Sequence, residues 1–595
     1  MKNNFTLQGI ICVTFLFLGT FASQAQLVTT NADDGSLGSL RNQIAIALPG
    51  EIITFSPTVN NIVLVSGQIT IDKSLTLMGN PLLNTTINGN AGGRIFDITA
   101  GNVILNDLIL TNGLADNGGA IQIMNANLTI DNTTITNSIA NGTSGSGGGI
   151  YVRTGATLTA FTSTISGNTA NRAGGGIESV AGTTTTLTNV NLSMNNAGLA
   201  PATAAPGNGG ALHITGNGTA TITAGTVNMN TAASEGGGLW NGTGTMTING
   251  TTINGNTASG VAADNGGGGI YNLNGGTLNI TDATISNNMA TGTAGSGGGI
   301  LNDVGATLNI TNSSITGNTA NRAGGGIEGN ATAGTNFVNL TNVNLNGNTV
   351  FSAPGNGGGL HMTGPGTIMI TDGTVNTNTA GAEGGGLWNG SGTMTINGTT
   401  INGNTASGAG TDQGGGGIYN FNGGTLVITD AVISNNIANG TAGSGGGILN
   451  DVGAQLSVTD SQITGNTAIR AGGGIEDNSL TSTIILTNVN LNTNAVTGPP
   501  GNGGGLHITG AGSATITGGT VNNNTATLEG GGLWNGAGTM IVDGTTINAN
   551  TCSGMAADDG GAGIFNTAGI LIVTNATITN NLATGTSGSG GGIFS

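Results

Sequence analysis

The sequence predicts an all-β protein, a parallel β-helix of about 20 coils with a short N-terminal capping helix. One observation is that residues 235–260, EGGGLWNGTGTMTINGTTINGNTASG, return at 383–408 with one substitution and at 529–554 with six. Another is that Gly-Gly-(Gly/Ala)-(Ile/Leu) recurs at intervals of 27 to 35 residues, with an average of 29.5. A fixed period of this length is typical of solenoids, in which each unit packs only against its neighbours.

Each unit predicts one coil with three short strands. In the first copy, Leu239 follows the glycines, Met246 and Ile248 lie two apart, and Ile253 precedes Asn256 by three residues. Side chains alternate along a strand, so these aliphatic residues are expected to point into a shared core. A leucine-rich repeat is the nearest alternative, but its convex segment would not tolerate 117 glycines in 595 residues.

Asparagine recurs three residues after the last aliphatic residue of many units. Examples are Asn168, Asn256, Asn288, Asn318 and Asn404. Stacked side-chain amides can bridge neighbouring coils and bond the backbone of turns. We therefore expect an asparagine ladder along the rod, which at ~4.8 Å per coil would be about 95 Å long.

The N-terminus predicts export. Residues 1–25 form a signal peptide with Lys2 in front, an apolar run over 10–21, and Ser23 and Ala25 before the cleavage point. The remaining chain divides into an N-terminal cap (26–55), irregular first coils (56–117) and regular repeats (118–595) that stop in mid-coil. This last feature suggests a fragment.

The cap contains one predicted amphipathic helix. Ser39 is the expected N-cap, Leu40, Ile44 and Leu48 share one helical face, and Pro49 starts the stop signal. A helix over the first coil would cover the open strand edges that otherwise favour end-to-end association.

Composition excludes several classes of partner. The net charge is −18, and no lysine occurs after residue 118. Arg172, Arg322 and Arg470 are isolated rather than clustered, so neither nucleic acid nor anionic lipid is expected to bind. The mature chain keeps only Cys552, which replaces an alanine of the matching copies and predicts a small buried side chain.

Chemistry-bearing residues are repeated rather than gathered. The carboxylates recur five units apart, as in the sets Glu178, Glu328 and Glu476; Glu235, Glu383 and Glu529; and Asp264, Asp412 and Asp558. No unique catalytic constellation results, and we expect no enzyme activity and no cofactor. Zinc is disfavoured because the three histidines do not share neighbouring coils. Asp282 and Asp430 are expected to form turns, and calcium binding by such turn carboxylates is left open.

One column of residues stands out. The residue after the Ile or Leu of each glycine motif should point away from the core, and this column contains every Trp, Tyr and His of the chain. Its candidate binding residues are Tyr151, Glu178, His213, Trp240, Tyr271, Glu328, His361, Trp388, Tyr419, Glu476, His507, Trp534 and Phe565. Two interpretations remain: a stacking ladder that stiffens the rod, with Glu178 and His213 as an ion pair, or a solvent-exposed stripe that binds sugars or protein side chains.

The array resembles the repeats of the polymorphic outer membrane proteins, whose signatures are GGA(I/L/V) and FxxN. Residues 118–121 and 209–212 match the first signature, whereas 253–256, INGN, has Ile in place of Phe. The leader within residues 26–55 is also similar to that of secreted bacterial β-helix proteins. The resemblance implies a right-handed β-helix that is exported to the cell surface, outer membrane or medium and acts in adhesion.

The expected function is therefore an adhesin-like, monomeric rod that presents a long repetitive surface to a polysaccharide or a host or cell-surface protein. Membrane attachment would need a missing C-terminal segment or a partner, because the chain contains no further long apolar run. The alternative is a carbohydrate-active β-helix that binds or cleaves polysaccharide.

Overall fold

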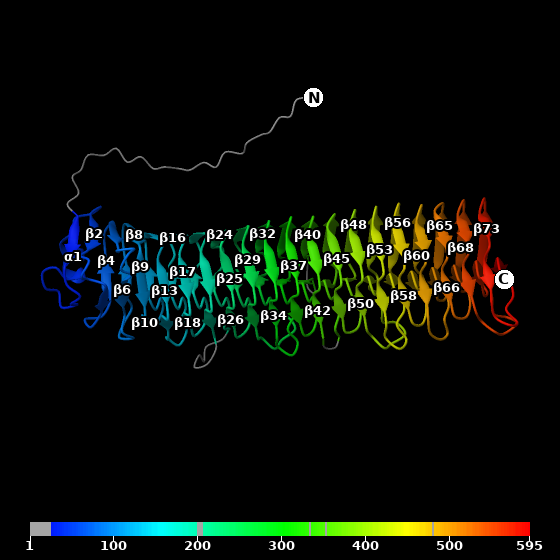
Figure 1. Cartoon of the computed structure of the whole chain (residues 1–595), viewed down its shortest axis with the longest axis horizontal. Coiled ribbons are helices and arrows are strands. Elements are labelled where there is room, and N and C mark those ends of the chain that lie inside the picture. Colours follow the sequence, from blue (N-terminus) through cyan, green and yellow to red (C-terminus); the bar gives the residue numbers. More distant parts are fainter. Residues whose placement is uncertain (1–24, 199–205, 332–334, 352–353, 479–480) are drawn as a thin grey trace, which may run out of the picture.

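The computed structural model describes residues 25–198, 206–331, 335–351, 354–478 and 481–595. The predicted signal peptide lies outside these residues, apart from Ala25. The described chain is a parallel β-helix with one α-helix and 75 short strands, wound into about 18 turns. Figure 1 shows a straight rod with the helix α1 at one end and the strands stacked in rows along it. The right-handed sense of winding stays a prediction.

A regular coil contains four strands rather than the three expected from the sequence. In one coil these are β27 (Leu239–Asn241), β28 (Thr245–Asn249), β29 (Thr252–Asn254) and β30 (Thr257–Ala258). They belong to four parallel sheets that we call C, A, B and D, with 19, 20, 19 and 17 strands respectively among the described residues. The strands of sheet D have only two residues each. A strand this short shows no alternation of apolar and polar residues, so the sequence did not indicate it.

Sheet C carries the predicted outward column. Its strands in the regular array are β11 (Ile121–Ile123), β15 (Ile150–Val152), β19 (Ile177–Ser179), β23 (Leu212–Ile214), β27, β31 (Ile270–Asn272), β35 (Ile300–Asn302), β39 (Ile327–Asn330), β43 (Leu360–Thr363), β47 (Leu387–Asn389), β51 (Ile418–Asn420), β55 (Ile448–Asn450), β59 (Ile475–Asp477), β63 (Leu506–Ile508), β67 (Leu533–Asn535), β71 (Ile564–Asn566) and β75 (Ile593–Phe594).

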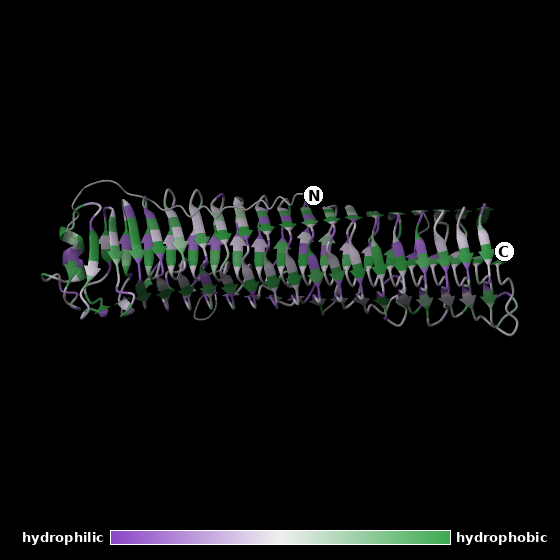
Figure 2. Cartoon of the chain, turned by 45° about the horizontal axis from the view of Figure 1, so that its top comes forward, coloured by the Kyte–Doolittle hydropathy of each residue, from purple (hydrophilic) through white to green (hydrophobic). Residues whose placement is uncertain are grey.

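The predicted aliphatic residues form one continuous core inside the rod. Leu239, Met246, Ile248 and Ile253 are fully buried and belong to a single cluster that runs from the cap to the last coils. Each lies in register with an aliphatic residue of the next coil, for example Ile253 with Ile285. The hydropathy colouring in Figure 2 shows apolar and polar residues alternating along the strands. Burial of such side chains contributes roughly 1.5 to 3 kcal/mol each.

The glycine motif is required because two backbones approach each other closely. Gly236 has a φ of +62°, in the left-handed region that other residues adopt at a cost. A Cβ on Gly237 would collide with the Gly268 carbonyl oxygen of the next coil. The motif therefore recurs once per coil, directly before each strand of sheet C in the regular array.

The predicted asparagine ladder is present. The Nδ2 of Asn256 donates to the Val227 carbonyl (2.8 Å) and to Oδ1 of Asn288 in the next coil (2.9 Å). Its own Oδ1 accepts from the backbone and side-chain nitrogens of Asn230 (3.0 and 2.9 Å). All three amides are fully buried. The ladder thus satisfies the polar groups of the turn between sheets B and D.

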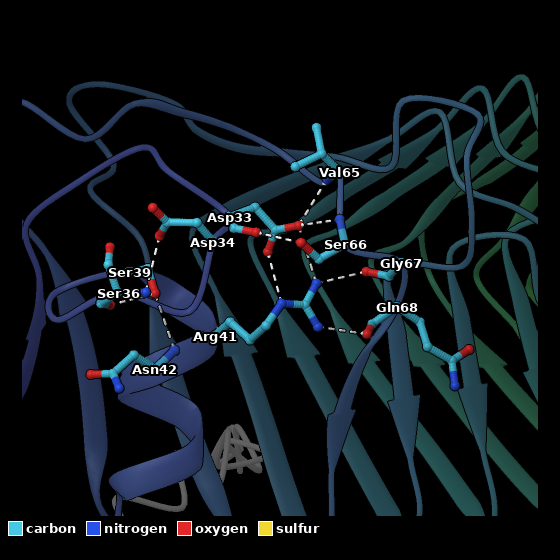
Figure 3. A network of polar contacts seen from close by, with 10 residues as sticks. All are labelled: Asp33, Asp34, Ser36, Ser39, Arg41, Asn42, Val65, Ser66, Gly67 and Gln68. Carbon is cyan, nitrogen blue, oxygen red and sulfur yellow. Dashed lines mark hydrogen bonds and ion pairs between the residues drawn. The ribbon is translucent and has the colours of Figure 1, made fainter.

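The N-terminal cap is fixed to the first coils by a polar network around Arg41 (Figure 3). The helix α1 (Leu40–Ile46) has Ser39 as its N-cap, as predicted. Arg41 donates to Asp33 (2.9 Å) and to the carbonyl oxygens of Gly67 and Gln68 (2.7 and 2.8 Å).

The prediction for Leu48 is wrong. The side chain is 67% exposed because the helix ends at Ile46, and residue 48 is therefore no longer on the buried helical face. Leu40 and Ile44 are buried as expected.

Cys552 is buried in sheet D, where it contacts Ala526 and Ala562. Burial raises the pKa of the thiol to about 11, so little reactive thiolate forms at neutral pH. We expect a thiol reagent to label the native protein much more slowly than the unfolded protein. Cys552→Ala should keep the melting temperature within a few degrees, because Ala258 and Ala406 fill the same position. Labelling at the rate of a free thiol would contradict this burial.

Candidate functional site

The predicted column lies in one row on the outer side of sheet C. Glu178 is in register with His213, His213 with Trp240, and Trp240 with Tyr271. The flanking Ile and Leu residues belong to the central core, whereas Trp240, Tyr271 and Leu301 form a separate cluster. The expectation that the column points away from the core is thus confirmed.

The aromatic rings of this column stack from coil to coil. The ring centroids of His213 and Trp240 are 4.2 Å apart, and those of Trp240 and Tyr271 are 5.9 Å apart with an interplanar angle of 2°. The arrangement recurs five coils later and again after that, in the series His361, Trp388 and Tyr419 and the series His507, Trp534, Phe565 and Phe594. Each stacked pair contributes about 0.5 to 1.5 kcal/mol beyond its buried area.

Of the two interpretations of the column, the solvent-exposed stripe is wrong and the stacking ladder holds. Trp240, Trp388 and Tyr271 are only 7%, 6% and 3% exposed. The stretch between sheets D and C lies over them: the hydroxyl of Tyr419 donates to the carbonyl of Asp412, which belongs to that stretch (3.3 Å). Strand alternation determines the direction of a side chain but not the path of the following loop. Of the whole column, only Tyr151, Trp534 and Phe594 are partly exposed.

Buried acid–histidine pairs occupy the coils before each tryptophan. Nδ1 of His213 lies 2.8 Å from Oε2 of Glu178, and both side chains are almost fully buried. The hydroxyl of Thr215 donates to the other oxygen of this carboxylate (2.6 Å). The same pair recurs as Glu328 with His361 and as Glu476 with His507, at 2.8 Å in both cases. The predicted contact between Glu178 and His213 is therefore present, and it occurs three times along the rod.

A second glutamate holds each tryptophan. The indole Nε1 of Trp388 donates to Oε2 of Glu383 (3.1 Å), which also accepts from Asn356 (3.2 Å). Burial raises the pKa of Glu383 to about 6, an effect that the Trp388 hydrogen bond partly offsets. Sequence reasoning missed this contact, although the signal was available: a glutamate lies five residues before each tryptophan.

The tyrosines of the column contact aspartates of the next coil. Tyr271 hydrogen-bonds the carboxylate of Asp303, and burial raises the pKa of its hydroxyl. Tyr419 and Asp451 repeat this contact. These groups therefore act as fixed structural partners inside the covered column.

A second ladder ends in a buried acid. Asn389 donates to Asn420 (2.8 Å), Asn420 donates to Asn450 (2.7 Å), and Asn450 donates to Oδ1 of Asp477 (2.9 Å). Asp477 is fully buried and also accepts from Ser482. Burial raises the pKa of Asp477 from 3.8 to about 7, because its ionised form loses hydration.

This acid predicts a pH-dependent stability. The unfolded state loses the Asp477 proton near pH 4 and the folded state only near pH 7, so the group destabilises the fold progressively between these values. Asp477→Asn should raise the melting temperature at pH 8 and leave it nearly unchanged at pH 3.5. The gain corresponds to at most about 4 kcal/mol, at 1.36 kcal/mol per pKa unit. A difference between the two proteins that stays constant from pH 3.5 to 8 would contradict the assignment.

One part of the column opens into a groove of about 470 Å³. It is lined by Ala263, Asp264, Asn274, Asp303, Val304, Arg322, Glu328, Asn330 and Thr363. These residues come from the turns and strands of four successive coils, β31 to β43. The groove is polar and combines three carboxylates with one guanidinium group.

In the described ranges, no group of three or more His, Cys, Asp or Glu side chains is arranged to hold a metal ion. Asp282 and Asp430 lie at the corners between sheets A and B, with a φ of 52° each, as turn formers. Within residues 25–595, outside the four short gaps named above, no helix has the length and apolar character to cross a bilayer.

Neither protein-family models nor curated protein sequences match this chain.

Proposed function

We propose that the chain is an exported, adhesin-like rod that binds its partner through the outer face of sheet A. The signal-like segment at 1–25 and the resemblance to surface β-helix repeats support export. With the aromatic column covered, sheet A offers the long repetitive surface that an adhesin of this type needs.

One observation carries this proposal: the outer face of sheet A is uncharged and consists mainly of threonine and asparagine, with the exposed apolar side chains of Phe337, Met369 and Ile485 among them. In β28, for example, Thr245, Thr247 and Asn249 alternate with buried Met246 and Ile248. One column stays in register over successive coils and consists of Thr188, Thr223, Asn249, Thr281, Thr311, Thr341, Thr371, Asn397, Thr429, Thr459, Thr487 and Thr517. No outward position from β20 (Thr184–Thr188) to β64 (Ser513–Thr517) holds a charged residue.

A stiff rod with a repetitive face can bind a partner through many weak contacts at once. Hydroxyl groups repeated every ~4.8 Å can each make a weak hydrogen bond, and a long polymer or a crowded cell surface can engage many of them together. The absence of charge suits an uncharged polysaccharide or a neutral patch of a surface protein, since neither partner would have to desolvate ionised groups.

The experiment compares two faces of the same rod. Thr221, Thr281 and Thr341 on sheet A are replaced together by Lys, and Thr231, Thr319 and Thr379 on sheet D serve as the matched control. We expect the sheet A variant to lose at least tenfold in retention on immobilised polysaccharides and cell surfaces, and the control to bind as the parent does. Equal binding by both variants, or a parent that stays inside the cell when expressed with residues 1–25, would contradict the proposal.

The second candidate is a carbohydrate-active β-helix, which the groove around Asp303 favours. Its carboxylates Asp264 and Asp303 recur five coils later as Asp412 and Asp451. Repetition favours binding over cleavage, because a hydrolase or lyase needs its carboxylates gathered once around a single bond.

A further inference from the structure

The groove over β31 to β43 differs from the equivalent region five coils later in the contacts that one arginine makes. Nη1 of Arg322 donates to Oγ of Ser296 (3.2 Å), and within the described residues no carboxylate lies within ion-pair distance of it. Arg470 occupies the same position five coils later, but it lies 3.5 Å from Glu476 and also donates to the Thr411 carbonyl (3.5 Å). Arg322 thus keeps free N–H donors in the groove, whereas the guanidinium group of Arg470 contacts Glu476 and the Thr411 carbonyl.

The other walls of the groove are held in place by their own contacts. Glu328 is 2% exposed and accepts from His361 and from the hydroxyl of Thr363, both at 2.8 Å. Asp303 accepts from Asn330 (3.2 Å) and hydrogen-bonds Tyr271 beneath it. The polar groups are therefore oriented before any ligand arrives, which lowers the entropic cost of binding.

The lining determines the class of ligand. The groove is lined by carboxylate acceptors and by guanidinium, amide and hydroxyl donors, with Val304 and Ala263 as small apolar surfaces. A sugar presents hydroxyl donors and acceptors together with apolar C–H faces, and therefore fits this mixture. Glu328 is buried against His361, so the accessible carboxylates are Asp264 and Asp303, and they outnumber the single guanidinium group of Arg322. An anionic sugar is therefore disfavoured and an amino sugar is favoured.

The shape of the groove agrees with a short chain along the rod axis. Its walls come from four consecutive coils, and the three intervals between them span about 14 Å at ~4.8 Å each. A volume of about 470 Å³ lies in the range of small-molecule sites. From this geometry we infer that the groove around Arg322 and Asp303 is a binding site for an oligosaccharide of neutral or amino sugars that lies parallel to the rod axis. This inference rests on the carbohydrate-binding alternative above and not on adhesion through sheet A.

The experiment is calorimetric titration of the full chain with three tetramers: a cello-oligosaccharide, a deacetylated chito-oligosaccharide and an oligogalacturonate. We expect the amino sugar to bind most tightly, the neutral sugar less tightly and the anionic sugar least. Arg322→Ala and Asp303→Asn should each weaken binding about tenfold or more, since each removes charge-assisted hydrogen bonds. Arg470→Ala is the matched control and should bind as the parent does.

Three outcomes would overturn the inference: no tetramer binds the parent at millimolar concentration, the oligogalacturonate binds best, or Arg470→Ala weakens binding as much as Arg322→Ala. If Arg322→Ala loses the near-ultraviolet circular dichroism of the parent, Asp264→Asn is tested in its place, because Asp264 lies at an exposed loop position. The sheet A variant should keep its tetramer affinity, so failure at the groove and failure of the adhesion proposal remain distinguishable.

Discussion

Ile253→Asp should unfold the coils around β29 and lower the melting temperature strongly. Ile253 is fully buried and stacks between Val227 and Ile285 of the neighbouring coils. An aspartate here would be an unpaired charge in an apolar core, which costs about 3 to 5 kcal/mol or forces the coil open. Thermal melting and limited proteolysis measure this effect.

The matched control is Thr252→Asp, which places the same charge one residue earlier on the outward side of β29. It should change the melting temperature by only a few degrees. If the two variants melt alike, the inward assignment of sheet B is wrong.

Asn256→Leu should have the second large effect. The substitution keeps the approximate volume but removes the four hydrogen bonds that Asn256 makes with Val227, Asn288 and Asn230. Partners left buried without a hydrogen bond cost about 1 to 3 kcal/mol each, so a total loss of about 3 to 5 kcal/mol is expected. Amide hydrogen exchange should show the loss of protection concentrated in the adjoining coils.

The control for the ladder is Asn249→Leu. Asn249 lies at an exposed position of sheet A, and its side chain is not part of the ladder. Comparable loss of protection in both variants would mean that the buried amides have no special role in joining the coils.

The interior of the rod was predictable because it follows from local periodicity. Leu239 and Ile253 are two points in a pattern that repeats every coil, and only a stacked strand buries both. The asparagine ladder was predictable for the same reason, since a buried amide at a constant position must find a partner in the neighbouring coil.

The surroundings of the column were not predictable from local pattern. The direction of Trp240 follows from alternation, but its burial depends on where residues 259–269 pass, and glycine-rich loops can take many paths. The free donors of Arg322 reflect a difference in side-chain contacts between two nearly identical repeats. Sequence comparison of the repeats shows Arg322 and Arg470 as equivalent, whereas their contacts differ.

Tryptophan fluorescence tests the central claim, that the aromatic column is a stacked ladder covered by loops. The chain contains three tryptophans, Trp240, Trp388 and Trp534, and all of them belong to the column, so the emission reports on nothing else. We expect blue-shifted emission and weak quenching by acrylamide in the native protein, with the partly exposed Trp534 as the most accessible of the three. Removing it by Trp534→Phe should reduce the quenched fraction further. Emission and quenching close to those of free tryptophan would contradict a covered column and would favour the interpretation of a solvent-exposed stripe.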